Sequence, residues 1–494
     1  MSNRNSIPLT FRSSFTAALV CFAAPLVLAG CDNARHDGPL QVSVIGSDQR
    51  TRAPVVPIAS RAGELIFAAT AQGLVSYDAA GDVVPGLAQR WIVVDDGKSY
   101  IFRLRRARWA NGERVDARDV RLLLLARLRR EAARDPYGSL AAVAEVLAMT
   151  GDVIEIRLKS ARPDFLLALA QPEMGVASRE GGTGPYRVTA KGDGTLLLSP
   201  VDEDDGDDAG QDERKRRLLR TERASRAIVR FQYGGADLVL GGTLADLPYV
   251  TLSDVNRRVV RFDPVQGLFG LALSPRTPMF DDPHVREALS MAIEREAIIA
   301  YFEMNRWKIA EQIVPQQLDL PHPPTVPGWS GMTMEERRNL AAGVMTRWRA
   351  QHGGKPIELT IALPPGPGTR LLFLALKLQF KAIGVDVKQV ERDADLTLID
   401  EVAPYDSIAW YLGRLSCARK VHCSEEAEAL LKQSVEATTM VDRLVLLGQA
   451  EPLIEAHNGF IPLATPVRWS LSTSRLNGFE PSPRGDHSLR GLVK

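Results

Sequence analysis

The sequence predicts an α/β protein with several domains and mixed sheets. Residues 357–363 and 385–390 are predicted strands, and a helical segment at 369–383 separates them. A strand, a helix and a strand in this order are typical of a parallel pair in an α/β lobe. Residues 99–104 place three large apolar side chains on one face, which indicates a half-buried strand. A chain of 494 residues is too long for one hydrophobic core, so two or three domains are expected.

The first 31 residues are typical of a bacterial export signal with a lipid-attachment site. Arg4 and Arg12 form a basic start, residues 15–28 form a short apolar run, and small residues then precede Cys31. This ending resembles a bacterial lipobox, which implies cleavage before Cys31 and lipidation of its sulfur and new amino group. An ordinary secretory peptide with an incidental cysteine is the alternative. A spanning helix is disfavoured, because it needs about 18–20 apolar residues.

Residues 73–120 contain two predicted hairpins followed by a helix. The sequence Asp-Asp-Gly at 95–97 is a tight-turn signal between strands at 91–94 and 99–104. Asp116 is the expected N-cap of the helix, which should run to about residue 133. This region therefore predicts structure rather than chemistry.

Two more helix starts can be read from capping residues. Asp281 and Pro283 are placed to begin a long helix whose apolar stripe reaches Ile299. Thr333 and Glu336 form a capping box for the next long helix. The remaining expected elements are helices at 59–72, 163–169, 425–434 and 441–457, and strands at 40–45, 153–158, 269–274 and 396–399.

The charge of the chain is nearly neutral and mixed in sign. The formal net charge is +1 at pH 7, and it falls to about −1 without Arg4 and Arg12. Nucleic-acid binding needs a concentrated basic surface, so no nucleic-acid partner is expected. Residues 202–213 hold eight carboxylates, but they lack the spacing and closing glutamate of a calcium loop. A solvated loop is expected there.

Two cysteines, Cys417 and Cys423, remain in the chain after the leader. Because an exported chain meets an oxidising compartment, a disulfide between them is one expectation, and two free thiols are the other. The C-x5-C spacing, with His422 alone beside it, matches no closed zinc pattern. We therefore expect neither a metal nor a cofactor.

The sequence lacks the common local motifs of enzymes. It lacks the patterns G-x-S-x-G, H-E-x-x-H, G-x-x-x-x-G-K and G-x-G-x-x-G. Its seven histidines are isolated in sequence, which favours surface and capping roles over catalysis. We expect a binding protein rather than an enzyme, with two lobes that close over a ligand by a hinge.

Three motifs resemble signatures of the family 5 extracytoplasmic solute-binding proteins of bacterial ABC importers, the oligopeptide, dipeptide and nickel type. The first, at 73–120, contains GLVSYDAAG, PGLAQRW, DDGKSYIFRLR and WANGERVDARDV. The second is GTGPY at 182–186, and the third is VREALSMAIER at 285–295, with Glu294 where the family usually has aspartate. The motifs follow the family's order, and the resemblance covers nearly the whole mature chain.

This resemblance implies a two-lobe, three-domain fold of the periplasmic-binding-protein type, cluster C, with mixed sheets and a hinge between the lobes. Domain I and domain II form the first lobe, and domain III forms the second. The expected boundaries are a signal peptide at 1–30, a tether at 31–39, domain I at 40–66, 181–265 and 460–494, domain II at 67–180, and domain III at 266–459.

The resemblance also implies the substrate-binding component of an ABC importer. Such a protein captures a peptide or a related small solute and presents it to the permease and ATPase subunits. We expect a monomer, lipid-anchored at the periplasmic face of the cytoplasmic membrane. The alternative is a degenerate homologue that acts as a membrane-anchored signalling or scaffold lipoprotein without transport. A shortened 200–230 region and an altered 401–404 segment motivate that alternative.

Ligand contacts are expected after the last strand of the second lobe. Peptide-binding members of the family carry a tryptophan and an ammonium-binding aspartate there, and the alignment puts Glu401 and Pro404 at those positions. Asp400, Glu401 or Asp406 could supply a displaced carboxylate, and exposed loop charges are the alternative. An arginine in the cleft would suit a ligand carboxylate. Two further expected pocket residues, in other segments by the same alignment, are Arg61 and Tyr137.

Overall fold

The computed structural model describes residues 38–46, 60–178, 181–191, 194–201, 212–304, 307–318 and 320–494. The chain divides into two compact units, Met1–Gly38 and Pro39–Lys494, and the second contains every element given below. The expected signal peptide, Cys31, nearly all of the tether and most of the acidic 202–213 loop lie outside the described residues. Among the residues that are described, no helix is both long and apolar enough to cross a membrane.

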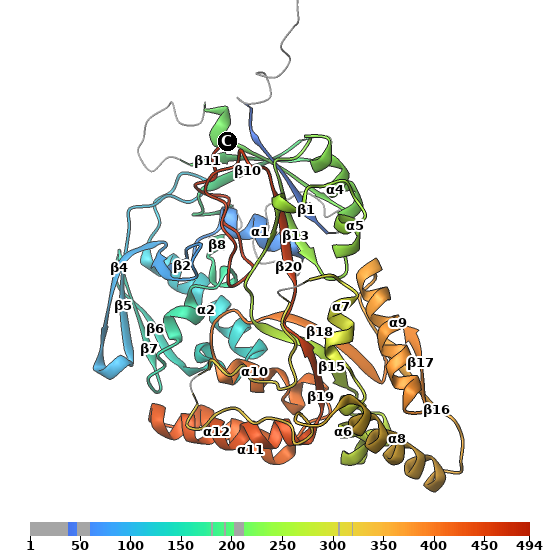
Figure 1. Ribbon diagram of the computed structural model, residues 1–494. Helices are drawn as coiled ribbons and strands as arrows, with labels where there is room; N and C mark the ends of the chain where they lie inside the picture. The colour runs from blue at the N-terminus through green and yellow to red at the C-terminus, as the bar shows by residue number, and fades with distance from the viewer. Residues whose placement is uncertain are drawn as a thin grey trace, which may run out of the picture. The chain divides into compact units, whose positions relative to one another are not determined.

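The first sheet, as far as it is described, has seven strands in the order β10-β11-β12-β1-β13-β20-β14 (Figure 1). Strands β12 and β13 flank β1 in parallel, and β20 runs antiparallel to β13. Helices α1 (Arg61–Thr70) and α4 (Ala224–Gln232) pack against β1, and α5 (Leu247–Thr251) follows β13. The strands are β1 (Leu40–Ile45), β10 (Tyr186–Ala190), β11 (Leu196–Pro200), β12 (Arg217–Glu222), β13 (Leu238–Thr243), β14 (Val260–Phe262) and β20 (Arg468–Ser472).

An antiparallel sheet of four described strands, in the order β4-β5-β7-β6, packs against α2 (Ala117–Arg134). We call residues 75–178, which contain this sheet, the four-stranded unit. The predicted hairpin is confirmed, with the turn at Asp95–Gly97, and Asp116 caps α2 by accepting from the Arg118 amide. The other elements of the unit are β2 (Val75–Tyr77), β3 (Val83–Pro85), β4 (Ala88–Val94), β5 (Ser99–Leu104), β6 (Val143–Thr150), β7 (Val153–Leu158), α3 (Phe165–Leu169) and β8 (Ala177–Ser178), which pairs with β9 (Gly181–Gly182).

The third sheet has five described strands in the order β17-β16-β18-β15-β19. Strands β16 and β17 are parallel and α9 (Pro367–Ala382) connects them, so the predicted strand–helix–strand unit is confirmed. Helix α8 (Met334–Gln351) begins at the predicted capping box of Thr333 and Glu336. The strands are β15 (Gly267–Leu273), β16 (Ile357–Ala362), β17 (Val385–Val390), β18 (Leu396–Val402) and β19 (Phe460–Ala464).

Three helices form a layer beside the five-stranded sheet, which we call the C-terminal helical layer. They are α10 (Ile408–Arg414), α11 (Glu425–Glu436) and α12 (Met440–His457). Helices α11 and α12 run side by side (Figure 1), and α10 packs on both. Ser424 and Thr439 cap α11 and α12, since each side chain accepts a backbone N–H bond from the first turn.

The GTGPY motif brings the chain against the end of α1. A side-chain carbon added to Gly182 would lie 2.2 Å from the Thr70 carbonyl oxygen, and one added to Gly184 would lie 2.3 Å from the Thr70 carbonyl carbon. Only glycine leaves room for these backbone contacts. Strand β10 begins at the last residue of the motif.

The predicted long helix from Pro283 to Ile299 is wrong, because the chain forms two helices there. Helix α6 (Pro283–Met291) is capped by Asp282 rather than Asp281, and α7 (Arg295–Ala300) follows after a break. The side-chain oxygen of Gln379, on α9, accepts a bond from the Glu294 N–H at 2.7 Å. Its side-chain nitrogen donates to the Glu294 carbonyl oxygen at 3.3 Å. The Glu294 N–H thus has a side-chain partner in place of a helical one, while the Glu294 carbonyl oxygen also accepts the Ile298 N–H at 3.3 Å.

The expected return of the chain to domain I at residue 460 falls at the start of β19. Strand β19 pairs antiparallel with β15, so Phe460–Ala464 belongs to the five-stranded sheet. The return occurs at β20, which pairs with β13 and β14. Both strands are buried along their whole length, and an apolar pattern alone does not tell which of two adjacent sheets a strand joins.

Candidate functional site

Asp400 lies in β18 and forms an ion pair with Arg468 of β20. The Arg468 Nη1 and the Asp400 Oδ1 are 2.8 Å apart, and Arg468 also donates to the Asp400 carbonyl oxygen. The side chains are 8% and 19% exposed, so the pair is largely removed from solvent. It joins the seven-stranded sheet to the five-stranded sheet at the point where the chain passes between them.

The other two predicted carboxylates are also paired with arginines. Asp406 accepts two bonds from Arg484, at 3.0 Å and 3.3 Å, and Arg484 is itself mostly buried in the C-terminal loop. Glu401 lies 3.1 Å from Arg414 of α10. Each carboxylate expected to meet a ligand ammonium therefore already holds a guanidinium in this structure.

Arg61 begins α1 and lies among carboxylates of the first lobe. Its Nη1 is 3.6 Å from Glu64 and 3.9 Å from Asp486. Desolvation raises the pKa of both carboxyl groups, although the Asp486 side chain is 43% exposed. The positive charge of Arg61 offsets part of this effect for each of the two carboxyl groups. Desolvation, and then the charge of Asp486, raises the pKa of Glu173 to about 7.

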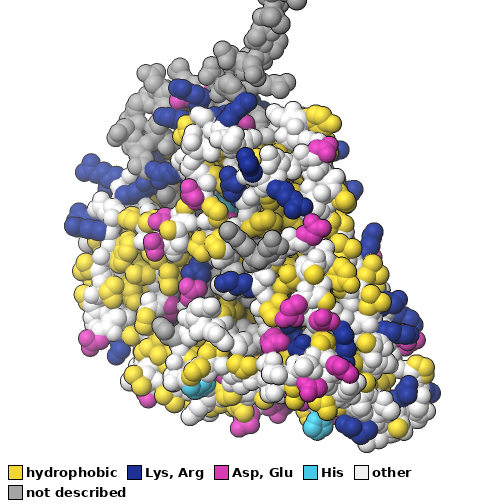
Figure 2. All heavy atoms as spheres, viewed as in Figure 1, with side chains coloured by type: hydrophobic (Ala, Val, Ile, Leu, Met, Phe, Trp, Pro, Cys, Tyr) yellow, Lys and Arg dark blue, Asp and Glu magenta, His cyan; other side chains and the backbone are white. Residues whose placement is uncertain are grey.

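These groups are close enough to influence one another. The positive charges of Arg61, Arg468 and Arg134 each favour the ionised form of Glu64. The hydroxyl of Tyr77, in β2, lies 2.6 Å from the Leu167 carbonyl oxygen and 3.1 Å from the Pro404 carbonyl oxygen, so its single hydrogen is shared between the two acceptors. The structure therefore brings Arg61 and the 400–406 carboxylates to one junction, where the first lobe meets the second. Figure 2 shows basic and acidic side chains interspersed over the visible face of the molecule.

Tyr137 takes a different place from that expected of a pocket-lining residue. It is 4% exposed, its hydroxyl donates to Glu428 of α11, and its carbonyl oxygen accepts from Arg443 of α12 at 2.6 Å. Burial raises its pKa, and the bond to Glu428 adds to this effect. Tyr137 thus contacts the C-terminal helical layer directly.

Sequence reasoning missed the arginines that hold the predicted carboxylates, together with Tyr77, Glu173 and Asp486. No local pattern marks them, because the partners in these pairs are far apart along the chain. Arg468 is 68 residues from Asp400, and Arg484 is 78 residues from Asp406. An arginine inside an otherwise apolar strand, such as Arg468 in RWSLS, is the one sequence feature that indicates a buried partner of opposite charge.

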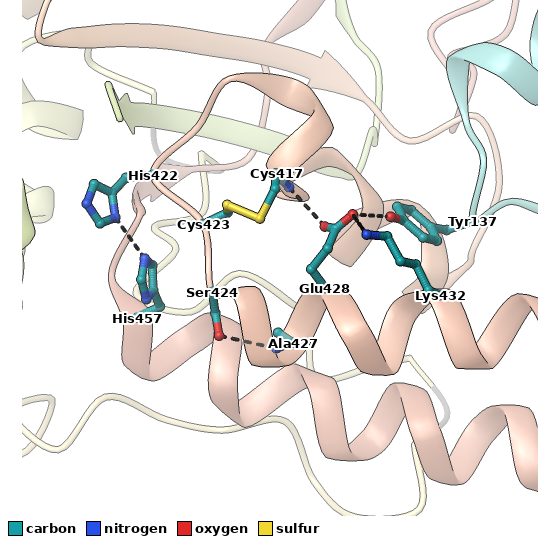
Figure 3. The surroundings of a disulfide bond; sticks show 9 residues. All are labelled: Tyr137, Cys417, His422, Cys423, Ser424, Ala427, Glu428, Lys432 and His457. Atoms are coloured by element: carbon teal, nitrogen blue, oxygen red, sulfur yellow. Dashed lines mark hydrogen bonds and ion pairs between the residues drawn. A yellow bond between two sulfur atoms is a disulfide. The ribbon is translucent and has the colours of Figure 1, made fainter. Parts of the chain in front are cut away.

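Cys417 and Cys423 are joined by a disulfide (Figure 3). Nearby, the His422 Nδ1 lies 2.8 Å from the His457 Nε2, and Asp281 lies 3.6 Å from the other ring nitrogen of His422. Burial, and then Arg286, lowers the pKa of both histidines, that of His457 to about 4. Across the described residues there is no group of three or more histidine, cysteine and acidic side chains that could hold a metal ion.

The mixed sheets, joined by crossing strands at a charged junction, give the protein a two-lobe α/β architecture with several domains. Residues 82–410 match the family model described as "Bacterial extracellular solute-binding proteins, family 5 Middle". The chain therefore belongs to family 5 of the bacterial extracellular solute-binding proteins, which confirms the family and the fold class predicted from the sequence.

Curated relatives and solved structures agree with this assignment. Dipeptide-binding protein DppE of Bacillus subtilis is 21% identical over 474 residues, covering 86% of each chain. Probable di/tripeptide-binding protein 5 of Pseudomonas aeruginosa is 24% identical over 489 residues, covering 83% of this chain and 87% of that protein. The murein tripeptide binding protein MppA of Escherichia coli has a TM-score of 0.76 at 19% identity, covering 92% of this chain and 98% of its own. OppA of Haemophilus influenzae, in complex with RPPGFSPFR, has a TM-score of 0.75 at 17% identity, covering 93% and 99%.

Proposed function

We propose that this protein captures a peptide, or a related small solute with both ammonium and carboxylate groups, between its two lobes and delivers it to the permease of an ABC importer. The observation that carries the proposal is the meeting of Arg61, Asp400 and Asp406, with their partners Arg468 and Arg484, at the junction of the lobes. Arginines suit a ligand carboxylate and carboxylates suit an ammonium group. The names of the relatives, which bind dipeptides, tripeptides and oligopeptides, support the same class of ligand.

We propose a division of the chain into the three expected domains, with one boundary moved. Domain I would contain 40–66, 181–265 and the chain from about 465 to the C-terminus, and domain III would run from 266 to about 464. The pairing of β19 with β15 supports this change. The four-stranded sheet lies inside the expected domain II at 67–180.

The test is native mass spectrometry of the soluble protein after export to the periplasm, without its leader. We expect an added mass that matches an unmodified small solute, since the proposed role is binding without catalysis. A thermal-shift screen with peptide libraries should then raise the melting temperature, because a ligand at 100 times its Kd adds about 2.7 kcal/mol of stability. Neither a bound solute nor a shift with any peptide would overturn the peptide proposal.

We further propose that the mature protein is a monomer anchored at Cys31 to the periplasmic face of the cytoplasmic membrane. The small residues before Cys31 support this. In cells, Cys31→Ala should abolish incorporation of labelled palmitate and release the protein into the soluble fraction. Labelling that persists in this variant would overturn the anchor. A mass of one chain in light scattering would agree with the monomer, and a larger mass would contradict it.

A further inference from the structure

At the junction, each lobe places one tyrosine side chain in a hydrophobic core of the other lobe. Tyr137 follows α2 of the four-stranded unit, yet its side chain packs in the core of the C-terminal helical layer. Tyr405 follows β18 of the five-stranded sheet, yet its side chain is 2% exposed and packs in the core of the four-stranded unit. The chain segments pass closely, because a side-chain carbon on Gly138 would lie 3.2 Å from the Tyr405 hydroxyl. Separating the lobes requires both rings to leave these cores.

Glu428 holds the Tyr137 hydroxyl. One carboxylate oxygen accepts the Tyr137 hydroxyl bond, and the other accepts the Cys417 backbone N–H at 2.9 Å (Figure 3). The Glu428 side chain is mostly buried, so both bonds matter more than they would in water. Lys432 lies 3.8 Å from the same carboxylate, but it is 69% exposed and contributes little.

The Cys417 amide is held in place by the disulfide. Cys423 directly precedes Ser424, which caps α11 by accepting from the Ala427 amide at 3.2 Å. The bond between Cys417 and Cys423 therefore ties the loop at 416–424 to the first turn of the helix that carries Glu428. Figure 3 shows the disulfide, Glu428 and Tyr137 in one chain of contacts.

Other contacts cross the same junction but do not involve the disulfide loop. Arg443 donates to the Tyr137 carbonyl oxygen, Arg162 donates to the Val435 carbonyl oxygen at 3.3 Å, and Tyr77 donates to the Pro404 carbonyl oxygen. The loop itself also contacts the four-stranded unit, because Arg419 donates to the Arg134 carbonyl oxygen. The Tyr137 hydroxyl bond is the contact that depends on the loop through Glu428.

We propose that Glu428 is a positioning residue that keeps Tyr137 in the core of the C-terminal helical layer, and that the disulfide between Cys417 and Cys423 sets how firmly it does so. The importance of this link for ligand retention rests on the proposed function, in which the lobes close over a solute. A weaker link raises the population of separated lobes, and the apparent affinity falls by the same factor. A hydrogen bond to a charged group corresponds to roughly a tenfold change in such an equilibrium.

Hydrogen exchange of the ligand-free mature protein, followed by mass spectrometry, tests the proposal without a known ligand. In Tyr137→Phe and Glu428→Gln, we expect amides at 134–142 and 403–407 to exchange about 10-fold faster. Amides of β1 and α9 should be unchanged. The matched control is Tyr186→Phe, because the Tyr186 hydroxyl bonds the Leu489 carbonyl oxygen at 2.9 Å and touches neither the junction nor the disulfide loop.

A double variant, Cys417→Ser with Cys423→Ser, tests the role of the disulfide. We expect the same two segments to exchange faster than in the parent, and adding Glu428→Gln to this variant should give little further effect. Unchanged exchange at 134–142 in Glu428→Gln, or full additivity in the combined variant, would overturn the inference. Faster exchange in a protein that binds no peptide would leave the inference standing and remove only the proposed function.

Discussion

At the scale of single residues, the junction is built from ion pairs that the protein makes with itself. Asp400 and Arg468 show this most clearly, because both side chains are largely buried and they come from different sheets. A buried charge that loses its partner costs more than a surface one, since the low-dielectric interior solvates it poorly. Glu401 and Arg414 form a similar pair near the surface, where solvent screens the interaction.

Asp400→Asn should lower the free energy of unfolding by about 2–3 kcal/mol, because it leaves the Arg468 guanidinium buried without a counter-charge. Urea unfolding followed by circular dichroism measures the change. Glu401→Gln is the matched control, and it should cost less than about 1 kcal/mol because its pair is half exposed. Equal losses in the two variants would contradict this distinction.

Glu455 should make the protein less stable as the pH rises. Burial raises its pKa to about 8, above an unfolded value of 4.5, so the folded state binds the extra proton between these values. The free energy of unfolding therefore falls from about pH 4.5 to pH 8 and is level above that. Glu455→Gln keeps an oxygen that can accept the Ile313 N–H bond and removes the titration.

We expect the Glu455→Gln variant to be about 1–3 kcal/mol more stable than the parent at pH 9, and to be similar at pH 4. Thermal unfolding of both proteins from pH 4 to pH 9 gives the comparison. Taking the difference between the two profiles removes the contributions of other groups, such as Glu173 and His457. A constant difference across this range would show that the pKa of Glu455 is the same in the folded and unfolded protein, and would contradict the raised pKa.

At the scale of elements, local sequence patterns were sufficient to predict the structure wherever the interacting residues lie close together in the chain. The hairpin around Asp95–Gly97, the capping box of Thr333 and Glu336, and the parallel unit around α9 were all predictable from local patterns. The break between α6 and α7 was not, because its cause is an amide side chain 85 residues away. The same limit applies to the junction, where Asp400 was identified from the family pattern but its partner Arg468 was not.

Gly184→Ala should destabilise the contact between the GTGPY motif and α1. The added carbon would meet backbone atoms of Thr70 and Ala71, which cannot move without shifting the helix. We expect a loss of about 2–4 kcal/mol in the free energy of unfolding. Gly328→Ala is the control, since an added carbon there meets nothing within 4 Å and should change stability by less than about 0.5 kcal/mol.

At the scale of the whole molecule, one hydrophobic cluster joins the two large sheets, and each sheet also packs against a further cluster on its own side. The largest core cluster includes Val239 and Trp469 of the seven-stranded sheet together with Leu271 and Ile361 of the five-stranded sheet. The four-stranded unit has a separate cluster, to which the second lobe contributes Tyr405. The sheets are therefore coupled more tightly to each other than either is to the four-stranded unit.

Amides in β13 and β20 should accordingly show the same opening free energy as those in β15 and β16, within about 1 kcal/mol. Native-state hydrogen exchange at increasing urea concentration measures these values. Amides in β5 and β7 should open at a lower urea concentration, because their core is independent. Separate transitions for the seven-stranded and five-stranded sheets would contradict coupling through the shared cluster.

The ion pairs that the protein makes with itself at the junction determine how ligand affinity depends on ionic strength. A zwitterionic solute that inserts between Asp406 and Arg484 takes over both partners, so one internal contact is exchanged for two with the ligand. Dissolved salt then screens the empty site and the occupied site to similar degrees. Affinity for such a solute should consequently change little with salt, whereas a ligand with a single charge would have to leave one of the two groups without a partner. The protein would thus select for solutes that carry both signs of charge at the right separation.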